Sequence, residues 1–130
     1  MTLRAEGPAS VDEVWGRYAA PSRWPSWSPQ IRAVRVAVDR IAPGLRGEVV
    51  SLAGITASFV VEAVDEERRR WTWRVRLGPV RLRLHHEVGP RPREGGPDGT
   101  ETSLRMEGPA PALLLYAGPA RLALGRLVRD

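Results

Sequence analysis

Two adjacent histidines and one tyrosine are the side chains of this sequence whose types and positions suit proton transfer. His85 and His86 belong to the alternating run VRLRLHHEV, which places His86 on the inward face between Leu84 and Val88. An imidazole there is able to donate or accept a proton near physiological pH. The other interpretation is a core histidine that is hydrogen-bonded to a neighbouring hydroxyl or carbonyl group.

Tyr116 lies on the apolar stripe of a helix that the sequence predicts over residues 109–130. Its hydroxyl could point into a cavity and orient a ligand carbonyl, or it could lie at the helix edge as an amphipathic tyrosine. We name His86 and Tyr116 as candidate catalytic residues. The sequence leaves open whether the protein is an enzyme.

Other catalytic chemistries have little support. The carboxylates Glu62, Glu87, Glu101 and Glu107 take outward positions on predicted strands, which indicates solvated charge rather than general acid and base work. The two histidines point to opposite faces and so do not converge on a metal. No nucleophile elbow, phosphate loop or dinucleotide fingerprint is present, so we expect neither a metal nor a cofactor.

Tryptophans give the sequence its most distinctive feature. In RWTWRVRL, Trp71 and Trp73 fall two apart on the inward face, where they form a flat wall for a planar ligand or simply fill the core. In RWPSWSPQIRAV, we expect Trp27 to anchor a helical turn and Trp24 to border a cavity entrance. The predicted lining of a ligand cavity is Trp24, Trp27, Phe59, Trp71, Trp73, Leu84, Met106 and Leu113.

Short helices and a run of strands must position these side chains. A first strand over residues 3–6 precedes a helix that Ser10 caps and that ends near Ala20, followed by one more helical turn before Pro29. Gly118 and Pro119 should bend the C-terminal helix. Between these helical segments, alternating apolar residues predict six strands over residues 31–39, 45–52, 55–65, 70–77, 80–88 and 100–107.

The alternation also predicts which side chains share a face. On the strand 55–65 the inward set is Ile55, Ala57, Phe59, Val61 and Ala63, and on the strand 31–39 it is Val34, Val36 and Val38. A sheet that is apolar on one face needs a cover on that face, and only the C-terminal helix is long enough to supply it. A curved sheet around one helix tends to leave a space between them, where pockets often lie.

Composition limits the class of protein. The 130 residues fit one domain, residues 1–130, and all 20 cationic side chains are arginine in a chain of net charge +5. Fifteen acidic residues are interspersed with the arginines, so we expect an ion-paired exterior and no nucleic-acid partner. The absence of cysteine, of an apolar leader and of a membrane-length apolar run favours a soluble cytoplasmic protein with no membrane insertion.

The order of elements resembles the START-like superfamily, also called SRPBCC, and within it the bacterial polyketide cyclase/dehydrase type. The resemblance covers nearly the whole chain and is most specific in SVDEVWGRYAAPSRWPSWSPQIRAV, with further likeness in VEAVDEERRRWTWRV and DGTETSLRMEG. It implies an α+β helix-grip fold, in which an antiparallel sheet of about seven strands curves around a long C-terminal helix, with two short helices after the first strand. A short first strand and a short segment between the second and fourth strands imply a small or open cavity.

The resemblance implies binding of a small hydrophobic or aromatic molecule in an internal cavity. The first hypothesis is a polyketide cyclase or dehydratase, in which His86 and Tyr116 steer enolate formation or water loss. The alternatives are a non-catalytic carrier or sensor of lipids or small molecules, and a protein-interaction module that uses the arginine-rich sheet exterior. A homodimer remains an open alternative to a monomer.

Overall fold

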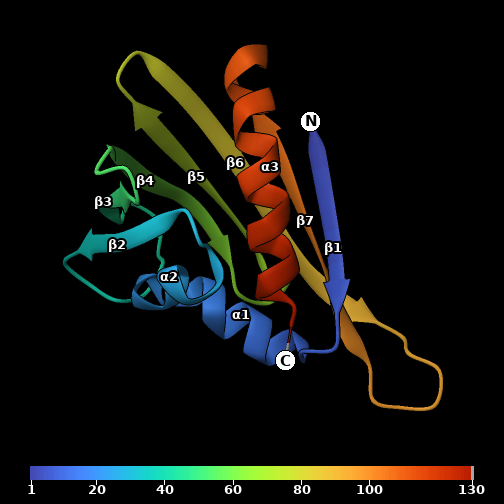
Figure 1. Ribbon diagram of the computed structural model, residues 1–130. Coiled ribbons are helices and arrows are strands. Elements are labelled where there is room, and N and C mark those ends of the chain that lie inside the picture. The colour runs from blue at the N-terminus through green and yellow to red at the C-terminus, as the bar shows by residue number, and fades with distance from the viewer. Residues whose placement is uncertain (130) are drawn as a thin grey trace.

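A seven-stranded antiparallel sheet that curves around one long helix forms the body of the protein (Figure 1). The computed structural model describes residues 1–129. The strands follow one another as hairpins from β2 to β7, and β1 joins the far edge beside β7, which gives the order β1-β7-β6-β5-β4-β3-β2. Their bounds are β1 (Thr2–Gly7), β2 (Ile31–Val36), β3 (Arg46–Ser51), β4 (Thr56–Asp65), β5 (Arg70–Leu77), β6 (Val80–Arg91) and β7 (Gly99–Glu107).

The helical segments lie where the capping residues and prolines predict them. Ser10 caps α1 (Val11–Ala19) by accepting a 3.1 Å hydrogen bond from the backbone N–H of Glu13. A 3-10 turn, η1 (Pro21–Arg23), and the short helix α2 (Trp24–Trp27) then lead into β2. The last element, α3 (Ala110–Leu127), is one helix that continues through Pro119. The predicted α+β helix-grip architecture is confirmed, including the short helices after β1.

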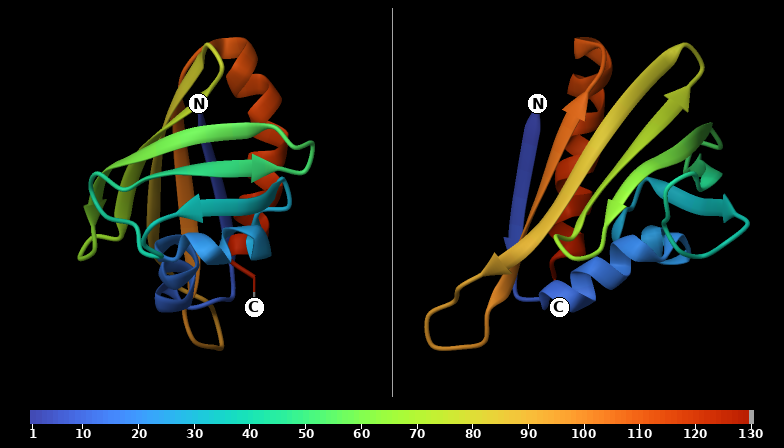
Figure 2. Two further views of the ribbon diagram at one scale, coloured as in Figure 1. Left: turned by 90° about the vertical axis from the view of Figure 1, so that its left-hand side faces the viewer. Right: turned by 180° about the vertical axis from the view of Figure 1, so that it is seen from behind.

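The C-terminal end of α3 is fastened to the N-terminal part of the chain (Figures 1 and 2). A guanidinium nitrogen of Arg17 on α1 donates hydrogen bonds of 2.6 Å to the carbonyls of Leu127 and Arg129. A cation at that end of a helix is stabilised by the helix dipole. The backbone N–H of Ala9 adds a 3.1 Å bond to the carbonyl of Val128.

The N-terminal half of α3 is much less covered. Leu114 and Leu115 are 69% and 81% exposed, whereas Leu124 and Leu127, further along the helix, are fully buried. Figure 2 shows the sheet bending away from this half of the helix. The space between helix and sheet therefore closes at one end and opens at the other.

Strict alternation misplaces two predicted inward residues. A bulge interrupts the pairing of β4 with β5 between Val61 and Ala63, so Val64 rather than Ala63 takes the next inward position and Ala63 is exposed. Val38 is 59% exposed because β2 ends at Val36 and the chain leaves the sheet there. Both predictions of inward placement are wrong, and both errors lie where the sheet bends or ends.

Candidate functional site

Two hollows lie between α3 and the concave face of the sheet. The larger, which we call the outer groove, has a volume of about 540 Å³ and runs under the N-terminal half of α3. The smaller, which we call the inner cavity, has a volume of about 20 Å³, enough for about one water molecule. Gln30, Ile31, Trp73 and Tyr116 border both hollows.

The outer groove is almost entirely apolar. Leu115 of α3, Ile55 and Leu77 are large apolar side chains on its walls, and they are 81%, 53% and 42% exposed. Its full lining is Gln30, Ile31, Val49, Ser51, Ile55, Ala57, Trp73, Val75, Leu77, Val80, Leu82, Leu84, Ala112, Leu115, Tyr116 and Pro119. Exposed apolar surface of this kind, gathered in a concave place, is typical of a binding site for an apolar molecule.

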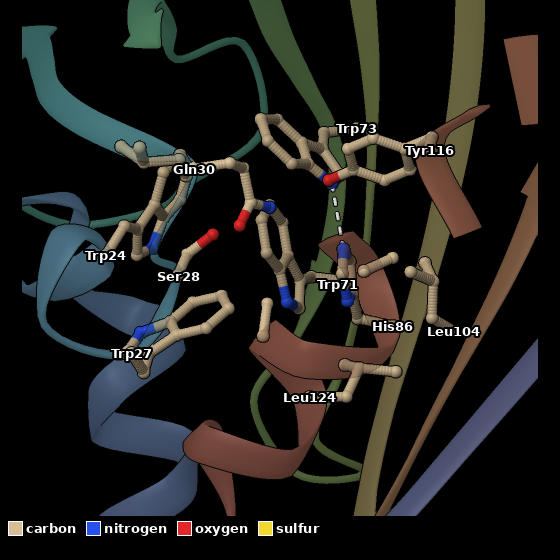
Figure 3. A pocket seen from close by; sticks show the side chains of 13 residues that line it. Trp24, Trp27, Ser28, Gln30, Trp71, Trp73, His86, Leu104, Tyr116 and Leu124 are labelled. Atoms are coloured by element: carbon tan, nitrogen blue, oxygen red, sulfur yellow. Dashed lines mark hydrogen bonds between the residues drawn. The ribbon is translucent and has the colours of Figure 1, made fainter. Parts of the chain in front are cut away.

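Aromatic rings build the inner cavity (Figure 3). Trp71 and Trp73 on β5 stack with ring centroids 5.2 Å apart and an angle of 30° between their planes. His86 on β6 stacks on Trp71 at 4.6 Å and 12°, and Trp24 of α2 lies against Trp71 at 5.7 Å and 29°. The remaining lining is Trp27, Ser28, Gln30, Ile31, Leu104, Tyr116, Ala120, Ala123 and Leu124.

A chain of hydrogen bonds fixes the state of His86. The indole N–H of Trp73 donates to Nε2 of His86 at 2.9 Å, so Nε2 is an acceptor and Nδ1 carries the proton. Nδ1 lies 3.0 Å from the Tyr18 hydroxyl, which lies 3.2 Å from the hydroxyl of Thr102. Thr102 in turn donates to the carbonyl of Glu87 at 2.9 Å. Each N–H and O–H group in this series of hydrogen bonds then has one acceptor, from the Trp73 indole to the backbone carbonyl of Glu87.

Burial keeps His86 and Tyr18, the two titratable members of this hydrogen-bond series, uncharged. Burial, with a smaller contribution from the charge of neighbouring His85, lowers the pKa of His86 to about 3. Burial also raises the pKa of Tyr18, against the opposing effect of its hydrogen bond with Thr102. His86 is therefore neutral near physiological pH, and both of its ring nitrogens are already bonded.

Tyr116 stands at the boundary between the two hollows. Burial raises the pKa of its hydroxyl, and a hydrogen bond with the Gln30 side chain acts in the opposite direction. In Figure 3 the amide nitrogen of Gln30 lies on the side of Tyr116, and its amide oxygen lies on the side of Ser28. The amide oxygen of Gln30 is left with no hydrogen-bond partner within residues 1–129, and the same is true of Nε1 of Trp71.

The structure gathers six of the ten predicted site residues around the inner cavity: His86, Tyr116, Trp24, Trp27, Trp71 and Trp73. Leu84 lines the outer groove. Phe59 and Met106 are buried in the core, and the half-buried Leu113 packs against that core. The role of each of these residues in binding or catalysis stays a prediction.

One placement within that set is wrong. Trp24 does not border an entrance, because it is only 1% exposed and its indole N–H donates a 2.9 Å hydrogen bond to the carbonyl of Tyr18. Trp27, at 8% exposed, donates to the carbonyl of Arg17 at 3.1 Å, as an anchor of this helical turn would. Both indoles therefore fasten α2 to α1.

Sequence reasoning missed two polar residues of the site. Tyr18 is visible in the sequence only as an apolar position of α1, and its inward face was the one available signal. Gln30 lies between Pro29 and the start of β2, where no periodicity applies. Their partners, His86 and Tyr116, come from distant strands and helices, so only the assembled fold brings these groups together.

The outward carboxylates form ion pairs with arginine. Glu62 accepts from Arg83 at 2.9 Å and lies 3.3 Å from Arg74, and Glu87 pairs with Arg70 at 2.8 Å. In the described part of the chain, no three His, Cys, Asp or Glu side chains gather as a metal site would require. Nor does any described helix have the length and apolarity needed to cross a membrane.

A helix-grip protein with an apolar groove beneath its C-terminal helix is the class that this fold and site define. The chain belongs to the family described as polyketide cyclase / dehydrase and lipid transport, whose sequence profile matches residues 1–130. It is thus a member of the START-like superfamily. This membership and the fold together support ligand binding in general and leave the ligand open.

Solved structures share the fold at low sequence identity. The protein XoxI from Bacillus cereus superposes with a TM-score of 0.80 at 16% identity, over 98% of this chain and 92% of that one. A protein of Nitrosospira multiformis gives 0.72 at 20% identity, over 98% and 92%. Ara h 8.0201 gives 0.67 at 11% identity, over 98% and 95%. A search of curated proteins found no match.

Proposed function

We propose that this protein binds a small apolar or aromatic molecule in the outer groove and carries or senses it without chemical change. The observation that carries the proposal is the groove itself, which has the volume of a small-molecule site and walls of exposed leucine and isoleucine. Covering such surface with a ligand removes apolar area from water, which is the main source of affinity for apolar molecules.

The state of His86 favours binding over catalysis. A general base needs a free lone pair and a pKa near the working pH. His86 has its lone pair on Nε2 engaged by Trp73, and its pKa is lowered to about 3. We therefore propose that His86 holds the aromatic wall in place and does not act as a general base toward the ligand.

A displacement assay tests the binding proposal. The neutral fluorescent probe N-phenyl-1-naphthylamine should bind the wild-type protein with one site, and small aromatic hydrocarbons should displace it. Replacing Leu115 by Arg introduces a charge and a long side chain at the groove wall, so the variant should bind the probe at least about tenfold more weakly.

The neighbouring residue supplies a matched control. Leu114 is also exposed and lies on the same turn of α3, but it does not line the groove among the described residues. The variant Leu114→Arg adds the same charge and should bind the probe as the wild type does. Equal probe affinity in both variants, or no probe binding by the wild type, would refute the proposed function.

A further inference from the structure

The inner cavity contains two polar atoms that the fold leaves without partners. One is the donor Nε1–H of Trp71, a residue that is only 2% exposed, and the other is the acceptor Oε1 of Gln30. Buried polar groups are nearly always hydrogen-bonded, and an exception calls for a physical explanation. Both residues border the same cavity of about 20 Å³ (Figure 3).

The surrounding residues make these two atoms a matched pair. The amide nitrogen of Gln30 lies on the side of Tyr116 and its oxygen on the side of Ser28 (Figure 3). The other three indoles around the cavity have partners: Trp24 with Tyr18, Trp27 with Arg17, and Trp73 with His86. Trp71 alone among the four keeps its N–H free within residues 1–129. The two unpartnered atoms thus border a space the size of a single oxygen-centred group, whose lining also includes the hydroxyls of Ser28 and Tyr116.

We propose that the inner cavity is a subsite for the hydroxyl group of an otherwise apolar ligand, an alcohol or a phenol. The hydroxyl accepts a hydrogen bond from Nε1–H of Trp71 and donates one to Oε1 of Gln30, while the apolar body of the ligand lies in the outer groove. The inference rests on the proposed binding function, because it needs a ligand in that groove.

Charge and hydrogen-bonding capacity select the hydroxyl over other groups. The lining of the inner cavity holds no arginine or carboxylate, and its one histidine is neutral, so an ionised carboxylate would be buried without a counter-charge. A ketone accepts from Trp71 but has no proton for Gln30. A hydroxyl both accepts from Trp71 and donates to Gln30. Gln30 and Tyr116 border both hollows, so the ligand would extend from the groove into the cavity between these two residues.

The test compares three ligands that share a naphthalene body. Dissociation constants of naphthalene, 2-naphthol and 2-naphthoate are measured at pH 7 by displacement of N-phenyl-1-naphthylamine. Two additional hydrogen bonds should make 2-naphthol bind the wild type about ten- to a hundredfold more tightly than naphthalene. The ionised 2-naphthoate should bind more weakly than 2-naphthol by a similar factor.

Two variants assign the preference to the two atoms. Trp71→Phe removes the donor and keeps an aromatic ring, and Gln30→Leu removes the acceptor and keeps a similar volume. Each should lower the ratio of the 2-naphthol to the naphthalene affinity by about tenfold. The ratio is taken within each variant, so a change of the groove wall that affects both ligands alike cancels.

The outcomes separate this inference from the binding function. Naphthalene and 2-naphthol binding equally well to the wild type would overturn the hydroxyl subsite and leave the groove function standing, as would a preference that both variants retain. A crystal structure of the 2-naphthol complex in which a water molecule fills the inner cavity and the hydroxyl lies elsewhere would also overturn it. If no ligand displaces the probe, the proposed function fails first.

Discussion

Nε1 of Trp73 donates a 2.9 Å hydrogen bond to Nε2 of His86 across the β5–β6 pair, and this contact decides which nitrogen of the neutral imidazole carries the proton. With Nε2 as acceptor, the only proton of the neutral ring is on Nδ1, which faces the Tyr18 hydroxyl. Protonating Nε2 would place two N–H groups against each other in a site from which water is excluded. Burial is the main cause of the low pKa of His86, and the loss of this hydrogen bond on protonation opposes the charged form in the same direction.

Acid should therefore destabilise the protein through His86. In the unfolded chain the imidazole takes up a proton near its ordinary pKa of 6.5, whereas in the folded protein it does so only near 3. The unfolded state thus binds more protons as the pH falls, so the contribution of His86 to stability is complete above pH 6.5 and is lost between pH 6.5 and 3. The slope should approach about 1.4 kcal/mol per pH unit. Urea unfolding at several pH values measures it.

The two histidines provide the control for this prediction. His86→Gln should lower the stability at pH 7 and should flatten its dependence on pH between 6.5 and 4.5, above the range in which most carboxylates titrate. His85→Gln changes the adjacent residue, which lies on the outer face between Thr72 and Glu107. It should keep most of the wild-type slope, because burial is the larger cause of the low pKa of His86. A flat profile for His85→Gln with an unchanged profile for His86→Gln would contradict the assignment.

The Tyr18 hydroxyl is expected to be worth a measurable part of the stability. It accepts from Nδ1 of His86 and donates to Thr102, so Tyr18→Phe leaves one buried donor without an acceptor. We expect a loss of about 1–3 kcal/mol in the free energy of unfolding, measured by urea denaturation. Ser103→Ala, at the half-buried position next to Thr102, should change it by less than about 0.5 kcal/mol. Equal effects of the two substitutions would mean that the hydrogen-bonded chain adds no stability.

The architecture was predictable because its signals are local and repeated. Alternation over β5 places Trp71 and Trp73 inward, and in β6 it separates His85 from His86, which the structure confirms. The Ser10 cap and Pro21 mark the limits of α1 in the same way. Alternation failed at Ala63 because a bulge adds one residue to β4, and no residue type there signals it.

The site was only partly predictable because it depends on contacts between distant segments. The sequence indicates that His86 faces inward, but whether its nitrogens are free depends on Tyr18, which is 68 residues away. The flanking Arg23 and Pro25 favour a Trp24 that borders a cavity entrance, yet the packing of α2 on α1 buries this side chain completely. The face of a strand on which a side chain lies depends on the local sequence, whereas its hydrogen-bond partners depend on which distant segments pack against it.

Trp71 and Trp73 allow a matched test of the hydrogen-bond chain. Both are buried on β5, and replacing either by Phe removes a similar volume. Trp73→Phe also leaves Nε2 of His86 without a donor, whereas the N–H that Trp71→Phe removes has no partner in the described chain. The Trp73 variant should therefore be less stable than the Trp71 variant by about 1–3 kcal/mol in urea unfolding. A Trp71 variant that is the less stable of the two would show that its N–H is bonded in solution.

The close approach of three strands at Gly47 should make this glycine irreplaceable. A Cβ added to Gly47 would lie 2.5 Å from the carbonyl oxygen of Arg35, 2.6 Å from Cγ1 of Val36 and 2.8 Å from Cζ of Phe59. Since the first of these atoms belongs to the backbone of the neighbouring strand, β2 would have to shift. Gly47→Ala should lower the free energy of unfolding by about 1–3 kcal/mol, measured by thermal or urea unfolding.

Gly89→Ala in β6 is the control, because a Cβ there meets no atom within 4 Å. Alanine restricts the unfolded chain more than glycine does, so this variant should keep the wild-type stability or exceed it by up to about 1 kcal/mol. Similar stabilities of the two variants would show that β2 and β3 are not packed as closely as this glycine requires.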